Sequence, residues 1–295
     1  MILRNREYAV AVSKIEKHTY DIKSVTFKTI PNGFNFWVAD PFPFEKDSKL
    51  YIFGEMYEYS SLKGSIAYTV LTDKGFSKWK KIIEEPFHLS FPNIFQIGND
   101  IYICPEAKQS KELYLYRCIS FPEKWVRERT LIDNTNCSDT VFLKKNNTNY
   151  AITCEWNGLN NHHMNIISFT EDGVFFAPIE YLKCIDNSLS RPAGKIFWDE
   201  SLKKDIAVFQ NCKERYGSGL VFKEFDLNFP YYSEKIIDTY NPEDIRCDLV
   251  KNFDGVHTFN MSEHYVVIDV IWSRFNLLEK CYRALRKFRK VRNNS

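Results

Sequence analysis

The chain has 295 residues, of which 44% are apolar and 16% aromatic, so it can bury a sizeable core and extended disorder is excluded. The formal net charge is only +2, and no stretch approaches the 18 or so consecutive apolar residues of a membrane span. The eight cysteines form no C-x-x-C pair, and the first residues lack the apolar run of a signal peptide. We therefore expect a cytoplasmic protein with reduced cysteines.

Five similar segments follow one another along the chain. Each has an inner strand, a turn and a second strand that ends with a polar residue. The inner strands open at Asp40, Phe91, Asp139, Arg191 and His257, which are 51, 48, 52 and 66 residues apart. The second strands end at Glu55, Glu106, Glu155, Gln210 and Asp269. A repeat of this period predicts a radial architecture with one small sheet per copy.

Further strand-like runs follow each inner pair, such as SIAYTVLT in the first copy and ELYLYRC in the second. That makes about four strands per copy, as in a propeller blade. The fifth copy lacks outer strands after Asp269, whereas residues 1–39 hold strands that belong to no copy. The sequence therefore predicts an all-β, five-bladed β-propeller over residues 1–273, with residues 1–39 closing the ring. The polar strand ends should converge at the central channel.

Residues 274–295 differ from the rest and are predicted to form a basic amphipathic helix. Residues 274–292 carry eight Lys and Arg side chains against one acid, Glu279. Large apolar residues recur at three- and four-residue steps, at Phe275, Leu278, Tyr282, Leu285 and Phe288. We expect residues 275–292 to lie on an anionic membrane surface, so that the protein associates peripherally with the inner face of a membrane. The alternatives are a helix packed on the propeller and a partner protein.

The repeat motifs also support a resemblance. The segments ADPFPF, LYIFGE, EPFHLSFPNIF, IYICPEA, SDTVF, SRPAGKIF, RYGSGL and GVHTFN resemble the propeller domain at the N-terminus of plant glucosamine inositolphosphorylceramide transferases and its stand-alone bacterial relatives. The resemblance covers about residues 37–270. The layout is similar, more distantly, to five-bladed glycosidases of the arabinanase and xylosidase type. The resemblance implies a sugar-handling site in the channel mouth. It leaves the reaction open, because in the plant proteins a separate C-terminal domain carries the transferase signature.

Comparison with those glycosidases suggests roles for three positions. Hydrolysis of a glycosidic bond normally needs two carboxyl groups. The resemblance makes Asp40 the base and Asp139 its helper, but Arg191 stands where the glycosidases carry the acid. An arginine holds its proton and cannot protonate a leaving alkoxide, whereas it suits a phosphate leaving group. We therefore expect a glycosyltransferase that uses a nucleotide sugar, with Asp40 or Asp139 as the base.

Other residues complete the predicted site. Glu106 is a third catalytic candidate, because Glu55 or Glu106 would be the general acid if the protein were a hydrolase. Lys213, Arg215 and Tyr216 follow the fourth copy closely and are expected to extend the anion site around Arg191. The remaining predicted substrate-binding residues are Glu55, His88, Glu155, Gln210, His257 and Asp269.

Each prediction has a structural alternative. Arg191 could instead pair with Glu155 or Asp269, and Asp40 could merely cap a tight turn. The adjacent His162 and His163 lack a zinc spacing, so no metal or resident cofactor is expected. Nucleic acid is not expected either, because the positive charge is confined to one short helix.

Together these features predict transfer of a sugar to a surface polysaccharide, such as a capsule or lipopolysaccharide, or to another lipid-linked glycan. A glycoside hydrolase and a non-catalytic carbohydrate-binding propeller are the alternatives.

Overall fold

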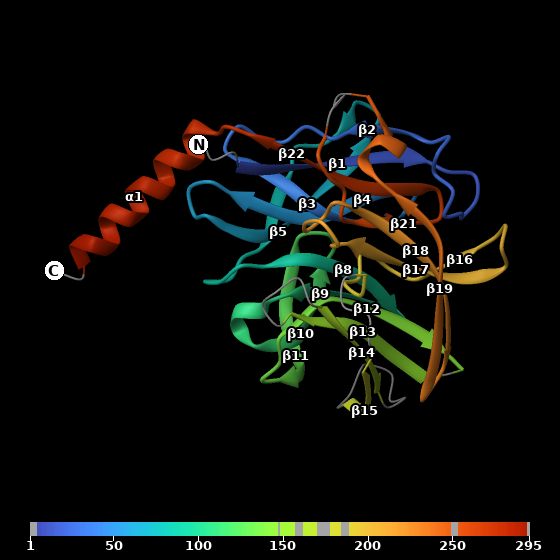
Figure 1. Cartoon of the computed structure of the whole chain (residues 1–295). Helices are drawn as coiled ribbons and strands as arrows, with labels where there is room; N and C mark the ends of the chain where they lie inside the picture. The colour runs from blue at the N-terminus through green and yellow to red at the C-terminus, as the bar shows by residue number, and fades with distance from the viewer. Residues whose placement is uncertain are drawn as a thin grey trace.

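The computed structural model describes residues 5–146, 148–156, 162–169, 178–183, 189–248 and 253–293. These residues form five β-sheets arranged in a ring, followed by one C-terminal helix (Figure 1); the strand pairs are antiparallel apart from one parallel pair in the last sheet. The predicted five-bladed β-propeller is therefore confirmed. Each sheet is one blade. After the N-terminal strands, which belong to the last blade, the chain runs through the blades in order around the ring.

Four blades are each built from one continuous part of the chain. Blade one contains β3 (Phe36–Lys46), β4 (Lys49–Glu58), β5 (Lys63–Thr72), β6 (Gly75–Phe76) and β7 (Lys80–Ile83). Blade two contains β8 (Ser90–Ile97), β9 (Asp100–Glu106), β10 (Glu112–Ser120) and β11 (Lys124–Asp133). Blade three contains β12 (Cys137–Lys145), β13 (Thr148–Trp156), β14 (His162–Phe169) and β15 (Pro178–Lys183). Blade four contains β16 (Phe197–Asp199), β17 (Lys204–Asn211), β18 (Gly219–Asn228) and β19 (Tyr231–Tyr240).

Blade five joins the two ends of the chain. It contains β21 (Phe259–Met261), β22 (Tyr265–Arg274), β1 (Asn5–Lys14), β2 (Thr26–Thr29) and β20 (Arg246–Cys247). β1 pairs with β22 along its whole length, from Asn5 opposite Arg274 to Lys14 opposite Tyr265. The prediction that the N-terminal strands close the ring is therefore confirmed. Without β1, the edge of β22 would lack its hydrogen-bonding partner.

The inner strands of blades one to three share a backbone irregularity at their polar ends. Asp40, Phe91 and Asp139 have φ angles of 51°, 45° and 50°. The pairing register with the second strand shifts at the same point in each blade. Such a bulge re-aims a side chain at the start of a strand, and positive φ in a residue other than glycine costs roughly 1–2 kcal/mol. Three blades therefore accept the same backbone strain, and in two of them the strained residue is a carboxylate, Asp40 or Asp139.

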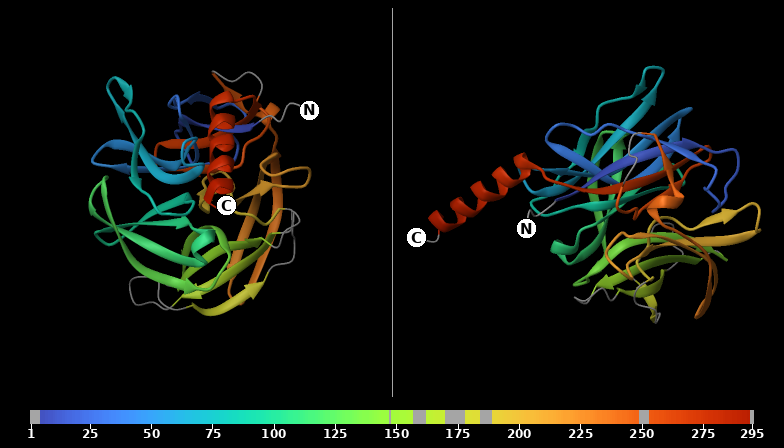
Figure 2. Two further views of the ribbon diagram at one scale, coloured as in Figure 1. Left: turned by 90° about the vertical axis from the view of Figure 1, so that its left-hand side faces the viewer. Right: turned by 45° about the horizontal axis from the view of Figure 1, so that its top comes forward.

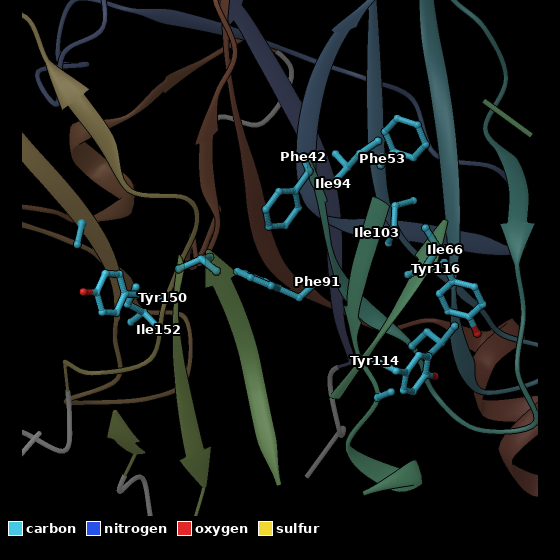
Figure 3. Close-up of a cluster of buried hydrophobic side chains, with 14 of the residues drawn as sticks. Phe42, Phe53, Ile66, Phe91, Ile94, Ile103, Tyr114, Tyr116, Tyr150 and Ile152 are labelled. Atoms are coloured by element: carbon cyan, nitrogen blue, oxygen red, sulfur yellow. The ribbon is translucent and has the colours of Figure 1, made fainter. Parts of the chain in front are cut away.

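Aromatic side chains fill the space between neighbouring blades. Phe42 on β3 meets Phe91 on β8 edge to face, with ring centroids 4.9 Å apart. Phe53, Tyr114 and Ile152 belong to the same buried cluster (Figure 3). This packing explains the high aromatic content of the sequence. The seven cysteines that the structure describes are free thiols, and Cys104, Cys154 and Cys212 among them are buried as predicted.

The predicted C-terminal helix is present as α1 (Leu277–Asn293). The side chain of Asn276 accepts a hydrogen bond from the backbone N–H of Glu279 at 3.0 Å and so caps its first turn. Among the apolar side chains of α1 that the structure describes, Leu278 and Tyr282 pack on the propeller core. The Phe288 side chain lies outside the described residues. No helix among them is long and apolar enough to cross a membrane.

Candidate active site

The polar strand ends of the repeats meet at one end of the ring. The Asp40 carboxylate accepts a hydrogen bond from the Phe91 N–H of blade two at 3.0 Å and one from the Thr258 hydroxyl of blade five at 2.9 Å. Its Oδ1 also lies 3.4 Å from His257 Nε2. Asp40 is only 5% exposed, so these contacts replace solvent around a buried carboxylate. Asp40 therefore does more than cap its own turn, because it joins three blades.

His257 is held between two carboxylates. Its Nδ1 lies 2.7 Å from Asp269 Oδ2, and the backbone N–H groups of His257 and Thr258 also donate to Asp269. Burial lowers the pKa of His257, but the charges of Asp269 and Asp40 outweigh it and raise the pKa to about 9. Burial raises the pKa of Asp40 to about 7, although the charge of His257 opposes the shift. Asp40 therefore titrates close to neutral pH, which suits a general base.

A second group of charges lies across blades two to four. Arg191 Nε lies 2.5 Å from Asp139 Oδ2, and Arg191 Nη2 lies 3.4 Å from Glu106 Oε2. The side-chain amide of Gln210 donates to the same Asp139 oxygen at 2.9 Å. Burial raises the pKa of Asp139 to about 7, while Arg191 lowers it and Glu106 raises it through its charge and a hydrogen bond. Arg191 is thus ion-paired, but its partners are Asp139 and Glu106. The structural alternative named Glu155 or Asp269 as the partner of Arg191, and that assignment is wrong.

Tyr216 connects the two groups of charges. The Arg191 guanidinium carbon lies 4.9 Å from the centre of the Tyr216 ring, and the same ring meets His257 edge-on with centroids 5.3 Å apart. The Tyr8 ring also lies near His257, with ring centroids 5.1 Å apart. No local pattern in the sequence points to Tyr8, because Tyr8 belongs to the closing strand. Thr258 follows His257 in the GVHTFN motif, but threonine is an ordinary strand residue type and does not mark a site residue by itself. Only the closure of the ring brings Tyr8 to the site.

Glu55 and His88 lie at the edge of this site. His88 Nε2 is 3.2 Å from Glu55 Oε1, and His88 Nδ1 accepts the Gly64 N–H at 3.0 Å. The backbone N–H therefore places the ring proton on the nitrogen that faces Glu55. The Tyr57 ring lies near His88, and Trp37 stacks on Tyr57 with ring centroids 4.6 Å apart and an interplanar angle of 8°. Flat aromatic faces of this kind can stack on sugar rings.

Other predicted residues lie apart from this cluster. Lys213 and Arg215 are exposed and line a groove with Asn211, Asn241 and Asp254. The Arg215 guanidinium donates to the Asp254 carbonyl rather than joining Arg191. Glu155, at the end of β13, is half-buried opposite Cys137. The side chains of His162 and His163 lie outside the described residues.

Among the described residues, one group could hold a metal ion. Ligand atoms of Asp40, His257 and Asp269 all lie within 4.8 Å of one another. Nδ1 of His257 is hydrogen-bonded to Asp269, and its Nε2 lies 3.4 Å from Asp40 Oδ1, so both ring nitrogens face a carboxylate. A cation there would have to displace the imidazole proton, because a histidine binds a metal only as neutral imidazole.

The fold and the site define a five-bladed propeller with a buried cluster of carboxylates, histidine and arginine at one channel end. A family model described as "Glucosamine inositolphosphorylceramide transferase 1, N-terminal" matches residues 18–234, and the chain belongs to this family. It is 38% identical over 100 residues to glucosamine inositolphosphorylceramide transferase 1 of Oryza sativa subsp. japonica, which is 33% of this chain and 13% of that protein. It is 31% identical over 121 residues to the protein of that name in Arabidopsis thaliana, 40% of this chain and 15% of that one. The chain therefore matches only a small part of the length of these relatives.

Solved structures agree on the fold. The catalytic domain of a GH62 α-L-arabinofuranosidase from Coprinopsis cinerea superposes with a TM-score of 0.61 at 9% identity, covering 90% of this chain and 97% of that one. A thermostable family-43 glycoside hydrolase gives a TM-score of 0.58 at 11% identity, covering 82% and 90%. At such low identity the likeness shows the fold alone. The expected resemblance to both groups is thus confirmed.

Proposed function

We propose that this propeller transfers a glycosyl residue from a nucleotide-sugar donor to a hydroxyl group of a surface polysaccharide or lipid-linked glycan. The main support for this proposal is the position of Arg191 in the site. Its guanidinium is fixed by Asp139 and Glu106 and lies over Tyr216, beside the buried Asp40–His257 pair. The family relatives named transferases support sugar transfer as the general chemistry.

The proposed step uses the two halves of the site separately. Asp40 accepts the proton of the acceptor hydroxyl, and the acceptor oxygen forms a bond to the anomeric carbon of the donor sugar. The bond between that carbon and the phosphate oxygen breaks, and the departing diphosphate keeps the electron pair. Nε and Nη2 of Arg191 contact carboxylates among the residues that the structure describes, and in the proposed step Nη1 meets the developing charge on the phosphate. Asp40 ends the step protonated, which its pKa of about 7 allows.

Glycoside hydrolysis is the second candidate, and the carboxyl pair of Glu106 and Asp139 favours it. Because the two groups share a hydrogen bond and the pKa of Asp139 is raised to about 7, the pair can hold a proton near neutral pH. Glu106 would then protonate the leaving oxygen while Asp40 activates water. In this reading Arg191 only organises the carboxyl pair, and no nucleotide is bound.

Calorimetric titration with a panel of nucleoside diphosphates and nucleotide sugars separates the two candidates. We expect one nucleotide to bind, and Arg191→Ala to weaken its binding about ten- to over a hundredfold, because a charge-assisted hydrogen bond contributes about 1.5–3 kcal/mol. Arg215→Ala is the matched control, since its guanidinium contacts a backbone carbonyl in a separate groove. Wild-type protein that binds no nucleotide but cleaves an aryl glycoside, with dependence on Asp40 and Glu106, would overturn the proposal.

A further inference from the structure

Large apolar side chains are exposed where α1 leaves the propeller. Phe34, in the loop before β3, is 90% exposed, and Phe275, Leu277 and Leu285 are 52%, 64% and 54% exposed. Phe34, Phe275, Leu277 and Cys281 line one groove of about 560 Å³. Leu277, Cys281 and Leu285 are four residues apart, so they lie in a row along the helix. We call Phe34, Phe275, Leu277, Cys281 and Leu285 the docking surface.

The neighbouring face of α1 is cationic. At 3.6 residues per turn, Lys280 and Lys287 lie beside the apolar row, whereas Arg283 and Arg286 lie further round the helix. Lys280 Nζ lies 4.3 Å from the centre of the Phe275 ring. Arg283 is the member that pairs with an acid of its own helix, Glu279. The apolar row and the cations together match an anionic lipid surface, which offers acyl chains beside negative headgroups. A second copy of this chain would instead bring two sets of these cations together.

We propose that the docking surface binds anionic membranes, with Phe34 and the apolar row of α1 entering the headgroup region and the cations meeting the lipid charges. The helix extends away from the ring and lies in front of it in the left view of Figure 2. Leu278 and Tyr282 fix its first turns to the propeller, which leaves Leu277 and Leu285 open to solvent. Leu278 and Tyr282 therefore attach the helix to the propeller, whereas Leu277 and Leu285 are exposed and available to contact lipid.

The first turns of α1 pack against aromatic residues at the edge of the candidate active site. Arg283 Nη2 lies 3.4 Å from the Tyr57 hydroxyl, and Tyr57 stacks on Trp37. Trp37 in turn meets Tyr8, whose ring lies 5.1 Å from His257. Membrane binding through α1 would therefore hold the site close to the lipid headgroups. This step rests on the proposed function, and it narrows the acceptor to a lipid-linked glycan.

Flotation with vesicles tests the docking surface alone. The vesicles consist of phosphatidylcholine with or without about 30% phosphatidylglycerol, because each Lys or Arg near an anionic surface adds about 1 kcal/mol to binding. Wild-type protein should float with the anionic vesicles at least about tenfold better, and 0.5 M salt should release it because it screens surface charge. Leu277→Asp with Leu285→Asp should lose at least about tenfold in binding, since both side chains would leave the acyl region.

Leu202→Asp is the matched control, because Leu202 is 40% exposed in the turn between β16 and β17, at the other end of the inner strands. It should bind like wild type. Equal binding by the wild type and the Leu277→Asp, Leu285→Asp variant would overturn the proposal. So would a stable dimer in vesicle-free solution that the double substitution splits, because the occupant would then be a second copy.

A second measurement tests the acceptor. Transfer to a soluble sugar acceptor should be unchanged in the double variant, whereas transfer to a lipid-linked acceptor in vesicles should fall about as much as vesicle binding does. If the wild type and the double variant transfer sugar to the vesicle acceptor at equal rates, the lipid-linked acceptor class is refuted, but the proposal of membrane binding still stands. If wild-type protein transfers no sugar to either acceptor, the proposed function fails, and flotation still decides the docking surface.

Discussion

Removing the Arg191 guanidinium should destabilise the protein in a manner that depends on pH. Arg191 contacts two carboxylates, and Asp139 is only 2% exposed. In the Arg191→Ala variant, Asp139 would have to remain ionised without its partner or bind a proton. Breaking a buried ion pair by deleting one partner costs about 3–5 kcal/mol, because the other charge is left uncompensated. We therefore expect Arg191→Ala to lower the free energy of unfolding by about 3–5 kcal/mol at pH 8.

The sign of the pH dependence follows from Asp139. Burial raises its pKa to about 7 even though Arg191 lowers it, so removing Arg191 should raise the pKa further. The unfolded carboxyl group titrates near its ordinary value of about 4. Between about pH 4 and the folded pKa, the folded state holds more protons than the unfolded state, so stability falls as pH rises. At pH 5 Asp139 is protonated with or without Arg191, so the loss should be smaller than at pH 8 by up to about 1.4 kcal/mol, which is the free energy of one pKa unit.

Urea unfolding at pH 5 and pH 8 measures both losses. The surface pair of Arg117 and Glu128 provides the control, since both side chains are about one-third exposed and solvent screens their charges, so Arg117→Ala should change stability little at either pH. Adding Asp139→Asn to Arg191→Ala should restore part of the stability at pH 8. A loss that is equal at the two pH values, or no larger than that of Arg117→Ala, would show that the pair is not a buried ionic contact.

Three further outcomes follow from the same structure. Asp40→Asn should abolish transfer while leaving nucleotide affinity within about threefold, because a base acts on the acceptor; a parallel loss of affinity in calorimetry would assign Asp40 to binding instead. In wild-type protein, kcat/KM should fall as pH drops through about 7, where Asp40 gains a proton, and a flat profile from pH 5.5 to 8.5 would argue against Asp40 as the base. Deleting residues 1–14 should prevent folding, since β22 would lose ten paired residues; a circular dichroism spectrum and melting curve like those of the full chain would refute this closure.

The sequence predicts the ring well because its repeats carry both the blade pattern and the polar strand ends. Asp40, Asp139 and His257 converge since equivalent positions of a radial repeat must share one end of the channel. The ion-pair partners of Arg191 were harder to predict. Arg191 pairs with Asp139 and Glu106, from the two preceding blades, and the lateral offset of one blade against another is not encoded in the spacing of the repeats.

The limits of the repeat pattern also explain the remaining differences. Lys213 and Arg215 follow Gln210 closely along the chain, but their loop turns outward into a separate groove, so proximity in sequence did not mean proximity in space. Tyr8 reaches His257 through strand pairing between the two chain ends, which no local pattern reveals. The amphipathic period of the tail predicted α1, whereas the exposed Phe34 beside it becomes visible only once the loop before β3 is placed in space.

The most direct test of the proposed function is a transfer assay with product analysis. Purified protein is incubated with a panel of nucleotide sugars and glycan acceptors, and the products are separated and identified by mass spectrometry. We predict that one donor yields equal amounts of free nucleoside diphosphate and of acceptor extended by one sugar, and that Asp40→Asn yields neither. Free sugar released from an aryl glycoside, with no nucleotide sugar consumed, would contradict glycosyl transfer and identify the propeller as a hydrolase.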